Sequence, residues 1–264
     1  LWGGLIVLGN APISADAVPA QIEGIPPSDQ NGLYGGTIAD DNSGVLKYIS
    51  IRHGGANIGE GNEINGLTLG GVGSGTVIEN IEIVSNQDDG IEWFGGTVNV
   101  KNAVVWNTGD DAIDTDQAWA GTLDNFAIVS PGDKCFELDG GEGDYNDEHT
   151  ITNGSVSAGT AKGLADLDKK GPAGTVGNSY VNMSNIYFTD VTYGQTFDEY
   201  SPDLTASNLE IVLPSDTLTV SDFFLDGTDV FATSVAEGAN TAGADVSLLD
   251  SWSWAGVAGA LDGL

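Results

Sequence analysis

Basic residues and cysteines are scarce in this chain. Six lysines and one arginine stand against 39 acidic residues, which gives a formal net charge of −32. Such a surface repels phosphate groups, so nucleic acids and anionic membranes are poor partners. It attracts divalent cations, or it suits a salty medium that screens the repulsion between its own charges. The single cysteine, Cys135, excludes an internal disulfide bond.

Long hydrophobic runs are also missing. No stretch approaches the length of a membrane span, so direct membrane insertion is not expected. The opening "LWGGLIVLGNAPISADA" lacks the positive residues of a signal peptide, and Gly9 interrupts its apolar run. We therefore interpret this segment as a strand of the mature fold. The 39 glycines among 264 residues follow no collagen-like period and indicate many tight turns.

An internal repeat is the strongest feature of the sequence. Asparagines recur before apolar runs at Asn80, Asn102, Asn125, Asn153, Asn185 and Asn208, in steps of 22, 23, 28, 32 and 23 residues. Ten residues after the first four asparagines lie the small residues Gly90, Ala112, Cys135 and Gly163, each followed by an apolar residue. The differences in step length must therefore lie in loops outside this unit, which is typical of a solenoid.

The first and third residues after each asparagine are mostly apolar, as in Ile81 and Ile83. Alternation with period two predicts strands, and steps of this length suit a right-handed parallel β-helix with three short strands per coil. We expect the asparagines to stack as a buried ladder, and Cys135 to lie in the core. We expect the chain to form one β-helix domain over residues 1–264, with a loop-rich insertion at 159–183 and a C-terminal closing segment at 231–264.

The start of the chain resembles an interior coil of the solenoid. Such an end has open backbone edges and an apolar cross-section that natural proteins normally cover. We expect upstream residues, a partner or another copy to cover it.

Aspartates gather at one turn in three consecutive coils. Asp88 and Asp89 precede Gly90, Asp110 and Asp111 precede Ala112, and Asp133 precedes Cys135 by two residues. Aspartate is a common turn residue because it hydrogen-bonds nearby backbone. Stacked carboxylates also repel one another, and clusters of oxygen atoms are what calcium prefers. The five aspartates are therefore candidate calcium ligands, with turn chemistry as the alternative.

Two tryptophans lie near this aspartate edge. Trp93 and Trp119 could form an exposed platform for a sugar ring, or they could pack beneath loops. We consider them as candidate ligand-binding residues.

The stretch "NTGDDAI" at residues 107–113 resembles the aspartate-pair motif of the polygalacturonases, which are β-helical glycoside hydrolases. The resemblance implies Asp110 or Asp111 as a proton donor and the other carboxylates, Asp89 among them, as activators of water, with inversion. Lys134 falls near the position of the histidine of that family, and the family's later Arg-Ile-Lys motif is absent. The scarcity of cations also disfavours acidic polysaccharides as substrates.

A second resemblance extends over most of residues 1–160. "WGGLIVLGNAPIS", "IEGIPPSDQNGLYGG", "YISIRHGG" and "DDGIEWFGGTVNVKNAVV" resemble a family of secreted β-helix proteins from Bacteroidota, as does the closing "SWSWAGVAGAL". The resemblance implies an extracellular or cell-surface location. It implies no particular activity, because that family has no established one. We expect a structural or binding role with a glycan or protein partner and calcium as a stabiliser. The alternatives are a glycan-cleaving enzyme that uses the aspartate edge and a subunit of a filament or surface complex.

Overall fold

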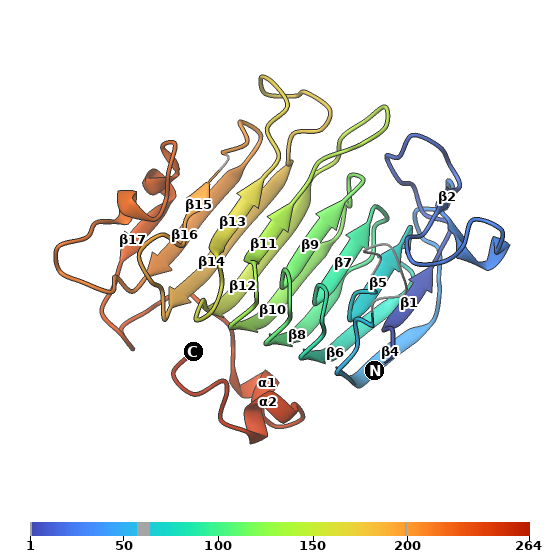
Figure 1. Ribbon diagram of the computed structural model, residues 1–264. Helices are drawn as coiled ribbons and strands as arrows, with labels where there is room; N and C mark the ends of the chain where they lie inside the picture. Colours follow the sequence, from blue (N-terminus) through green and yellow to red (C-terminus); the bar gives the residue numbers. More distant parts are fainter. Residues whose placement is uncertain (1, 57–63, 199) are drawn as a thin grey trace.

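The structure of the protein is a computed structural model that describes residues 2–56, 64–198 and 200–264. Successive long strands alternate between two large parallel sheets, so that each circuit of the chain adds one strand to each sheet (Figure 1). The chain is therefore an all-β parallel β-helix, as the repeat predicts. No helix in the described part is long and apolar enough to span a membrane.

In each of the two large sheets the strands lie side by side in the order in which they occur along the chain. The first sheet contains β1 (Leu5–Leu8), β5 (Leu67–Gly70), β7 (Ile91–Phe94), β9 (Ile113–Asp116), β11 (Lys134–Leu138), β13 (Gly163–Leu167) and β15 (Phe197–Asp198). The second contains β4 (Val45–Arg52), β6 (Val77–Val84), β8 (Val100–Trp106), β10 (Thr122–Val129), β12 (His149–Ser157), β14 (Val181–Thr189), β16 (Thr205–Ile211) and β17 (Ala232–Ser234). Outside them lie the antiparallel pair β2 (Ala20–Gln21) and β3 (Leu33–Tyr34), the short 3-10 helices η1 (Gln30–Gly32), η2 (Val220–Asp222) and η3 (Thr228–Phe231), and the helices α1 (Ser247–Asp250) and α2 (Trp254–Val257).

The repeat asparagines bend the strands of the second sheet. All six have φ between 52° and 59°, a left-handed conformation that asparagine tolerates better than most residues. In β6 this residue shifts the phase of the alternation, so that Ile78 before Asn80 and Ile81 after it both point into the core. Each coil therefore has two strands, of which the longer is bent, instead of the three short strands that we expected.

The asparagine side chains connect successive coils. Three steps are hydrogen-bonded: Asn125 Nδ2 donates to Asn102 Oδ1 at 2.8 Å, Asn185 Nδ2 to Asn153 Oδ1 at 2.7 Å and Asn208 Nδ2 to Asn185 Oδ1 at 2.9 Å. Asn153 donates to Asp124 Oδ1 instead of to the asparagine of the preceding coil. Asn80 and Asn125 are buried, whereas Asn102 is half-buried. The predicted ladder is thus formed at three of its five steps, since among the described residues no hydrogen bond joins Asn102 to Asn80. The burial expected of all six asparagines holds for two, whereas Asn153 and Asn185 are half-buried and Asn208 is exposed.

The core is a continuous apolar column between the sheets. Cys135 lies in it as expected, and burial raises the pKa of its thiol. Gly154 occupies an inward position because the Phe126 ring fills the space of a side chain there: a Cβ on Gly154 would lie 2.1 Å from the ring. The ten-residue repeat aligns Gly163 with Cys135, but the strand register places Gly163 beside Lys134. The turn before β13 is therefore one residue longer than the repeat predicts.

Residues 240–264, the C-terminal strap, cross the outer face of the second sheet toward the first coils, and the last residues then turn back toward the later coils (Figure 1). Glu210 on β16 accepts the backbone N–H groups of Thr241 and Ala242, and Asn125 on β10 accepts that of Asp245. Near the far edge, Glu82 on β6 accepts the N–H of Ala255. The predicted closing segment thus contributes β17 and this strap.

The predicted insertion at 159–183 is too broad. It contains β13 and the first residues of β14, so the loop between these strands covers only residues 168–180. At the other end of the solenoid, β1 and β4 are the terminal strands of their sheets. That another segment or molecule covers them stays a prediction.

Candidate functional site

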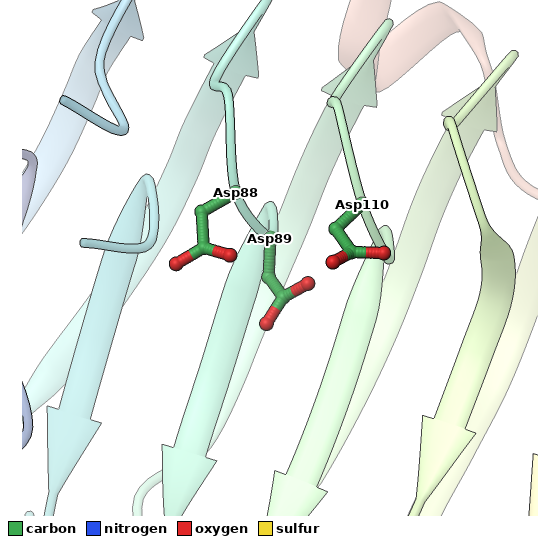
Figure 2. A group of neighbouring side chains, drawn as sticks. All are labelled: Asp88, Asp89 and Asp110. Atoms are coloured by element: carbon green, nitrogen blue, oxygen red, sulfur yellow. The ribbon is translucent and has the colours of Figure 1, made fainter. Parts of the chain in front are cut away.

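Three of the predicted aspartates lie together. Asp88 and Asp89 come from the turn before β7, and Asp110 comes from the turn before β9 (Figure 2). Each offers a carboxylate oxygen within 4.8 Å of the other two. Asp89 is buried, Asp88 is half-buried and Asp110 is exposed, so the group opens toward solvent on one side.

Asp89 and Asp111 also brace the turns of successive coils. The backbone N–H of Asp111 donates to Asp89 Oδ1 at 2.9 Å, and the N–H of Lys134 donates to Asp111 Oδ1. Each carboxylate therefore holds the next coil, and turn chemistry accounts for much of this aspartate column. Asp111 is not part of the group that contains Asp88, Asp89 and Asp110.

Asp133, the fifth predicted ligand, forms ion pairs with two lysines. Lys162 Nζ lies 2.9 Å from Asp133 Oδ2, and Lys134 Nζ lies 3.5 Å from Oδ1. Partial burial favours a higher pKa for this carboxyl, but the hydrogen bond and charges of the two lysines outweigh it and lower the pKa. Lys134 also contacts Asp166 at 3.7 Å, so it neutralises local carboxylates. Asp133 is therefore neutralised by lysines and is not part of the group of Asp88, Asp89 and Asp110.

Trp93 and Trp119 do not form an exposed platform. Their exposed fractions are 0% and 1%, and their rings stack with centroids 4.5 Å apart inside the solenoid. The reason is the alternation of β7, in which Ile91 and Trp93 point inward while Glu92 points outward. The packing alternative accounts for both tryptophans.

The outer face of the first sheet carries a row of carboxylates that the sequence analysis missed. Strand register places Glu92, Asp114, Glu137, Asp166 and Asp198 side by side on five successive strands. Two residues further along the chain, Asp116 ends β9, and Asp139 and Asp168 directly follow β11 and β13. The signal was present as an acidic residue after an apolar one in "IEWF", "IDTD", "FELD" and "ADLD". We call these eight residues, with Asp88, Asp89, Asp110 and Asp111, the acidic face.

The deepest part of the acidic face is a second group of three carboxylates. Asp89, Glu92 and Asp114 are all buried, and each has an oxygen within 4.8 Å of the other two. The fully buried Asn65 donates from Nδ2 to Glu92. Its Oδ1 has no hydrogen-bond partner among the described residues. Asp89 thus belongs to two groups, and Asn65 adds a neutral oxygen beside the inner one.

Burial and mutual repulsion change the titration of this face. Burial, reinforced by neighbouring carboxylates, raises the pKa of Asp89, Glu92 and Asp114 well above the usual range. The same causes raise the pKa of Asp116 to about 7 and that of Asp139 to about 8.

In the described ranges no basic side chain forms an ion pair with Glu92, Asp114 or Asp116. Near neutral pH these groups must share protons or bind a cation. The donor set consists of oxygens alone, which fits a hard divalent cation such as calcium.

The residues that the polygalacturonase motif implies are only partly suited to catalysis. Burial raises the pKa of Asp111 to about 9, and a hydrogen bond that protonated Asp111 donates to Glu137 and the charge of Asp89 raise it further. A protonated Asp111 fits a proton donor. Asp89 and Asp110 belong to the outer carboxylate group, and the amine of Lys134 is directed to Asp133 and Asp166.

Comparison with known proteins gives one match. A family model described as a pectate-lyase-like β-helix domain matches residues 1–254. No curated protein and no solved structure matches the chain.

Proposed function

Because the chain belongs to the family of pectate-lyase-like β-helix domains, which fits a glycan-related protein, we propose that it is a binding protein whose acidic face holds divalent cations, with calcium as the first candidate. The observation that supports this best is the inner group of Asp89, Glu92 and Asp114, which are buried together without a basic partner among the described residues. We place the protein outside the cell or on its surface.

The three inner carboxylates lie close together, so their negative charges repel one another when they are ionised. Two unit charges about 5 Å apart repel by about 3 kcal/mol at an effective dielectric constant of about 20. A divalent cation between them replaces this repulsion with attraction and makes protonation unnecessary. Its binding to the folded state alone stabilises that state by mass action.

A cation at this face also offers a way to bind a partner. Calcium takes about six to eight oxygen ligands, more than three monodentate carboxylates and the Asn65 amide supply. The outer group of Asp88, Asp89 and Asp110 opens toward solvent, so a cation there keeps positions for water or for oxygens of a glycan or a surface protein. The acidic face would then bind its partner through cations.

The test is a melting curve with calcium and with excess chelator, combined with calorimetric titration of calcium. We expect calcium to raise the melting temperature of the natural chain. The double variant Glu92→Gln/Asp114→Asn should lose this shift, since it removes two of the three inner carboxylates. Asp216→Asn, at an exposed position after β16, is the control and should keep it. Identical curves for the natural chain in calcium and chelator would refute the proposal.

A glycan-cleaving enzyme is the second candidate, favoured by the raised pKa of Asp111. Release of new reducing ends from a polysaccharide by the natural chain, and its loss in Asp111→Asn with the fold retained, would support it over a purely binding role. The amide of asparagine can still accept the N–H of Lys134, so this variant separates proton donation from the bracing of the turn.

A further inference from the structure

A cluster of aromatic side chains lies on the second sheet, away from the acidic face. It consists of Trp2, Tyr48, His53, Trp106, Trp252 and Trp254, which we call the aromatic corner. Tyr48 lies on the terminal strand β4, Trp106 ends β8, and Trp252 and Trp254 come from the strap. Residues from four separate parts of the chain therefore meet at one surface.

Contacts fix the rings against one another. Trp254 packs edge-on against Trp106 and His53, with centroids 5.7 and 6.3 Å apart. Trp252 packs in the same way on Tyr48, at 6.2 Å. The Nε1–H of Trp2 donates to the backbone oxygen of Arg52 at 2.9 Å. A rigid arrangement of this kind loses little conformational entropy when a ligand binds.

Arg52, the only arginine of the chain, lies at the centre of the corner. Its guanidinium carbon is 4.3 Å from the centroid of the Trp254 ring, and one of its nitrogens is 3.4 Å from Glu82. Glu82 is fully buried and also accepts the N–H of Ala255 in the strap. The guanidinium therefore carries N–H donors at a fixed place beside the rings.

The rings are more exposed than packing of the strap alone requires. Tyr48 is 68% exposed, Trp2 48% and Trp254 37%. Large aromatic side chains that gather on a surface with an arginine mark a binding site, because their exposure to water is costly until a ligand covers them. Here the side chain of Tyr48 occupies the position where later coils have a ladder asparagine.

We propose that the aromatic corner binds an uncharged glycan. The flat apolar face of a sugar ring fits against the exposed indole and phenol rings, and its hydroxyls fit the N–H donors of Arg52 and the polar tips of Tyr48 and His53. A net charge of −32 opposes an acidic glycan, and Glu82 already partners the single arginine. The Arg52 guanidinium covers Trp254 where a cationic ligand would stack.

This site needs no cation and goes beyond the proposed function of the acidic face. Its binding should be the same in calcium and in chelator. Failure of one proposal therefore leaves the other intact, and the two can be measured on the same sample.

The probes are neutral hexasaccharides of β-1,4-glucan, β-1,3-glucan, β-1,4-xylan and β-1,4-mannan, with α-1,4-galacturonan as the acidic comparison. Titration calorimetry and tryptophan fluorescence report binding to the full chain. We expect at least one neutral hexasaccharide to bind. The variant Trp2→Ala/Tyr48→Ser should weaken that binding at least tenfold, and Tyr193→Ser, at an equally exposed tyrosine that follows β14, should leave it unchanged.

Trp2 and Tyr48 are chosen because each is largely exposed, so their loss leaves the anchoring of the strap by Trp254 in place. Three results would overturn the proposal: no neutral hexasaccharide binds at millimolar concentration, binding persists in Trp2→Ala/Tyr48→Ser, or only galacturonan binds. A dimer that the same variant abolishes, without glycan binding, would reassign the corner to contact between copies.

Discussion

Substitution of Asn125 tests the ladder at the point where it meets the strap. This buried side chain donates from Nδ2 to Asn102 Oδ1 at 2.8 Å and accepts the N–H of Asp245 at 2.7 Å. Its backbone has φ of 59°. Alanine at this position removes both hydrogen bonds and must also adopt a left-handed conformation.

The expected cost follows from these two terms. A non-glycine residue in the left-handed region costs about 1–2 kcal/mol. A buried donor or acceptor that loses its partner costs about 1–3 kcal/mol. Asn125→Ala should therefore lower the free energy of unfolding by about 2–5 kcal/mol. Asn125→Gly loses the same hydrogen bonds without the steric strain, but it carries a chain-entropy cost of about 0.5–1 kcal/mol.

Glycine should thus be the less harmful replacement at Asn125, by about 0.5–1 kcal/mol. Asn182 on β14 provides the control, because it is a strand asparagine without a positive φ. There the order should reverse, with alanine better than glycine by a similar amount. Urea denaturation of the four variants, compared by transition midpoint at constant slope, measures both differences. If alanine is better than glycine at both positions, the left-handed conformation is not what selects asparagine.

Two further predictions concern charge and packing. In chelator, the free energy of unfolding should fall as pH rises from about 5 to 9. The pKa values of Asp116 and Asp139 in the folded state are raised to about 7 and about 8. In this range the folded state therefore keeps protons that the unfolded state has already released, and a rising pH favours the unfolded state. Melting curves across this range, with calcium as the comparison, would show the calcium effect growing with pH; a rise in stability would contradict the argument. Gly154→Ala should cost about 1–3 kcal/mol through overlap with the Phe126 ring. Phe126→Leu in the same chain should restore part of this in urea denaturation, and no restoration would show that the ring is not the cause.

The solenoid could be predicted because its determinants are local. Each coil needs a residue that tolerates a left-handed backbone at the same place, and asparagines at Asn80, Asn102 and Asn125 provide it. The bend they produce was harder to foresee. A left-handed residue shifts the inward phase of a strand without ending it, so three predicted short strands became two.

The orientation of Trp93 could have been predicted by the same alternation. Ile91 follows the small residue at the turn and points into the core. Because side chains alternate along a strand, Glu92 must then point outward and Trp93 inward. The same alternation in the next strand, β9, makes Asp114 point outward beside Glu92. The strand carboxylates of the acidic face could therefore have been predicted from the period-two alternation, whereas the turn aspartates alone do not reveal them.

The strap is different, because its pairing with the second sheet joins residues far apart in the sequence. Asp245 meets Asn125 across 120 positions, and no local pattern specifies that contact. An indirect signal exists in the outward position two residues after the ladder asparagine. In the middle coils this outward position is held by Val104 and Ala127, both apolar and buried. A sheet face in contact with water would have polar residues there. Apolar residues on both faces of a strand indicate that something covers each face.

Coverage by the strap also determines where a ligand can reach the second sheet. The strap shields the middle strands, with Leu249, Ala255 and Leu261 packed over Val104 and Ala127. The strap reaches the terminal strand β4 at Trp252 and then turns back, and the exposed rings of the aromatic corner lie at this turn. The acidic face belongs to the other sheet and has its own chemistry of oxygen ligands. Chelator should therefore remove cation-dependent binding at the acidic face and leave glycan binding at the aromatic corner unchanged, whereas the Trp2→Ala/Tyr48→Ser variant should weaken glycan binding at least tenfold and leave calcium binding unchanged.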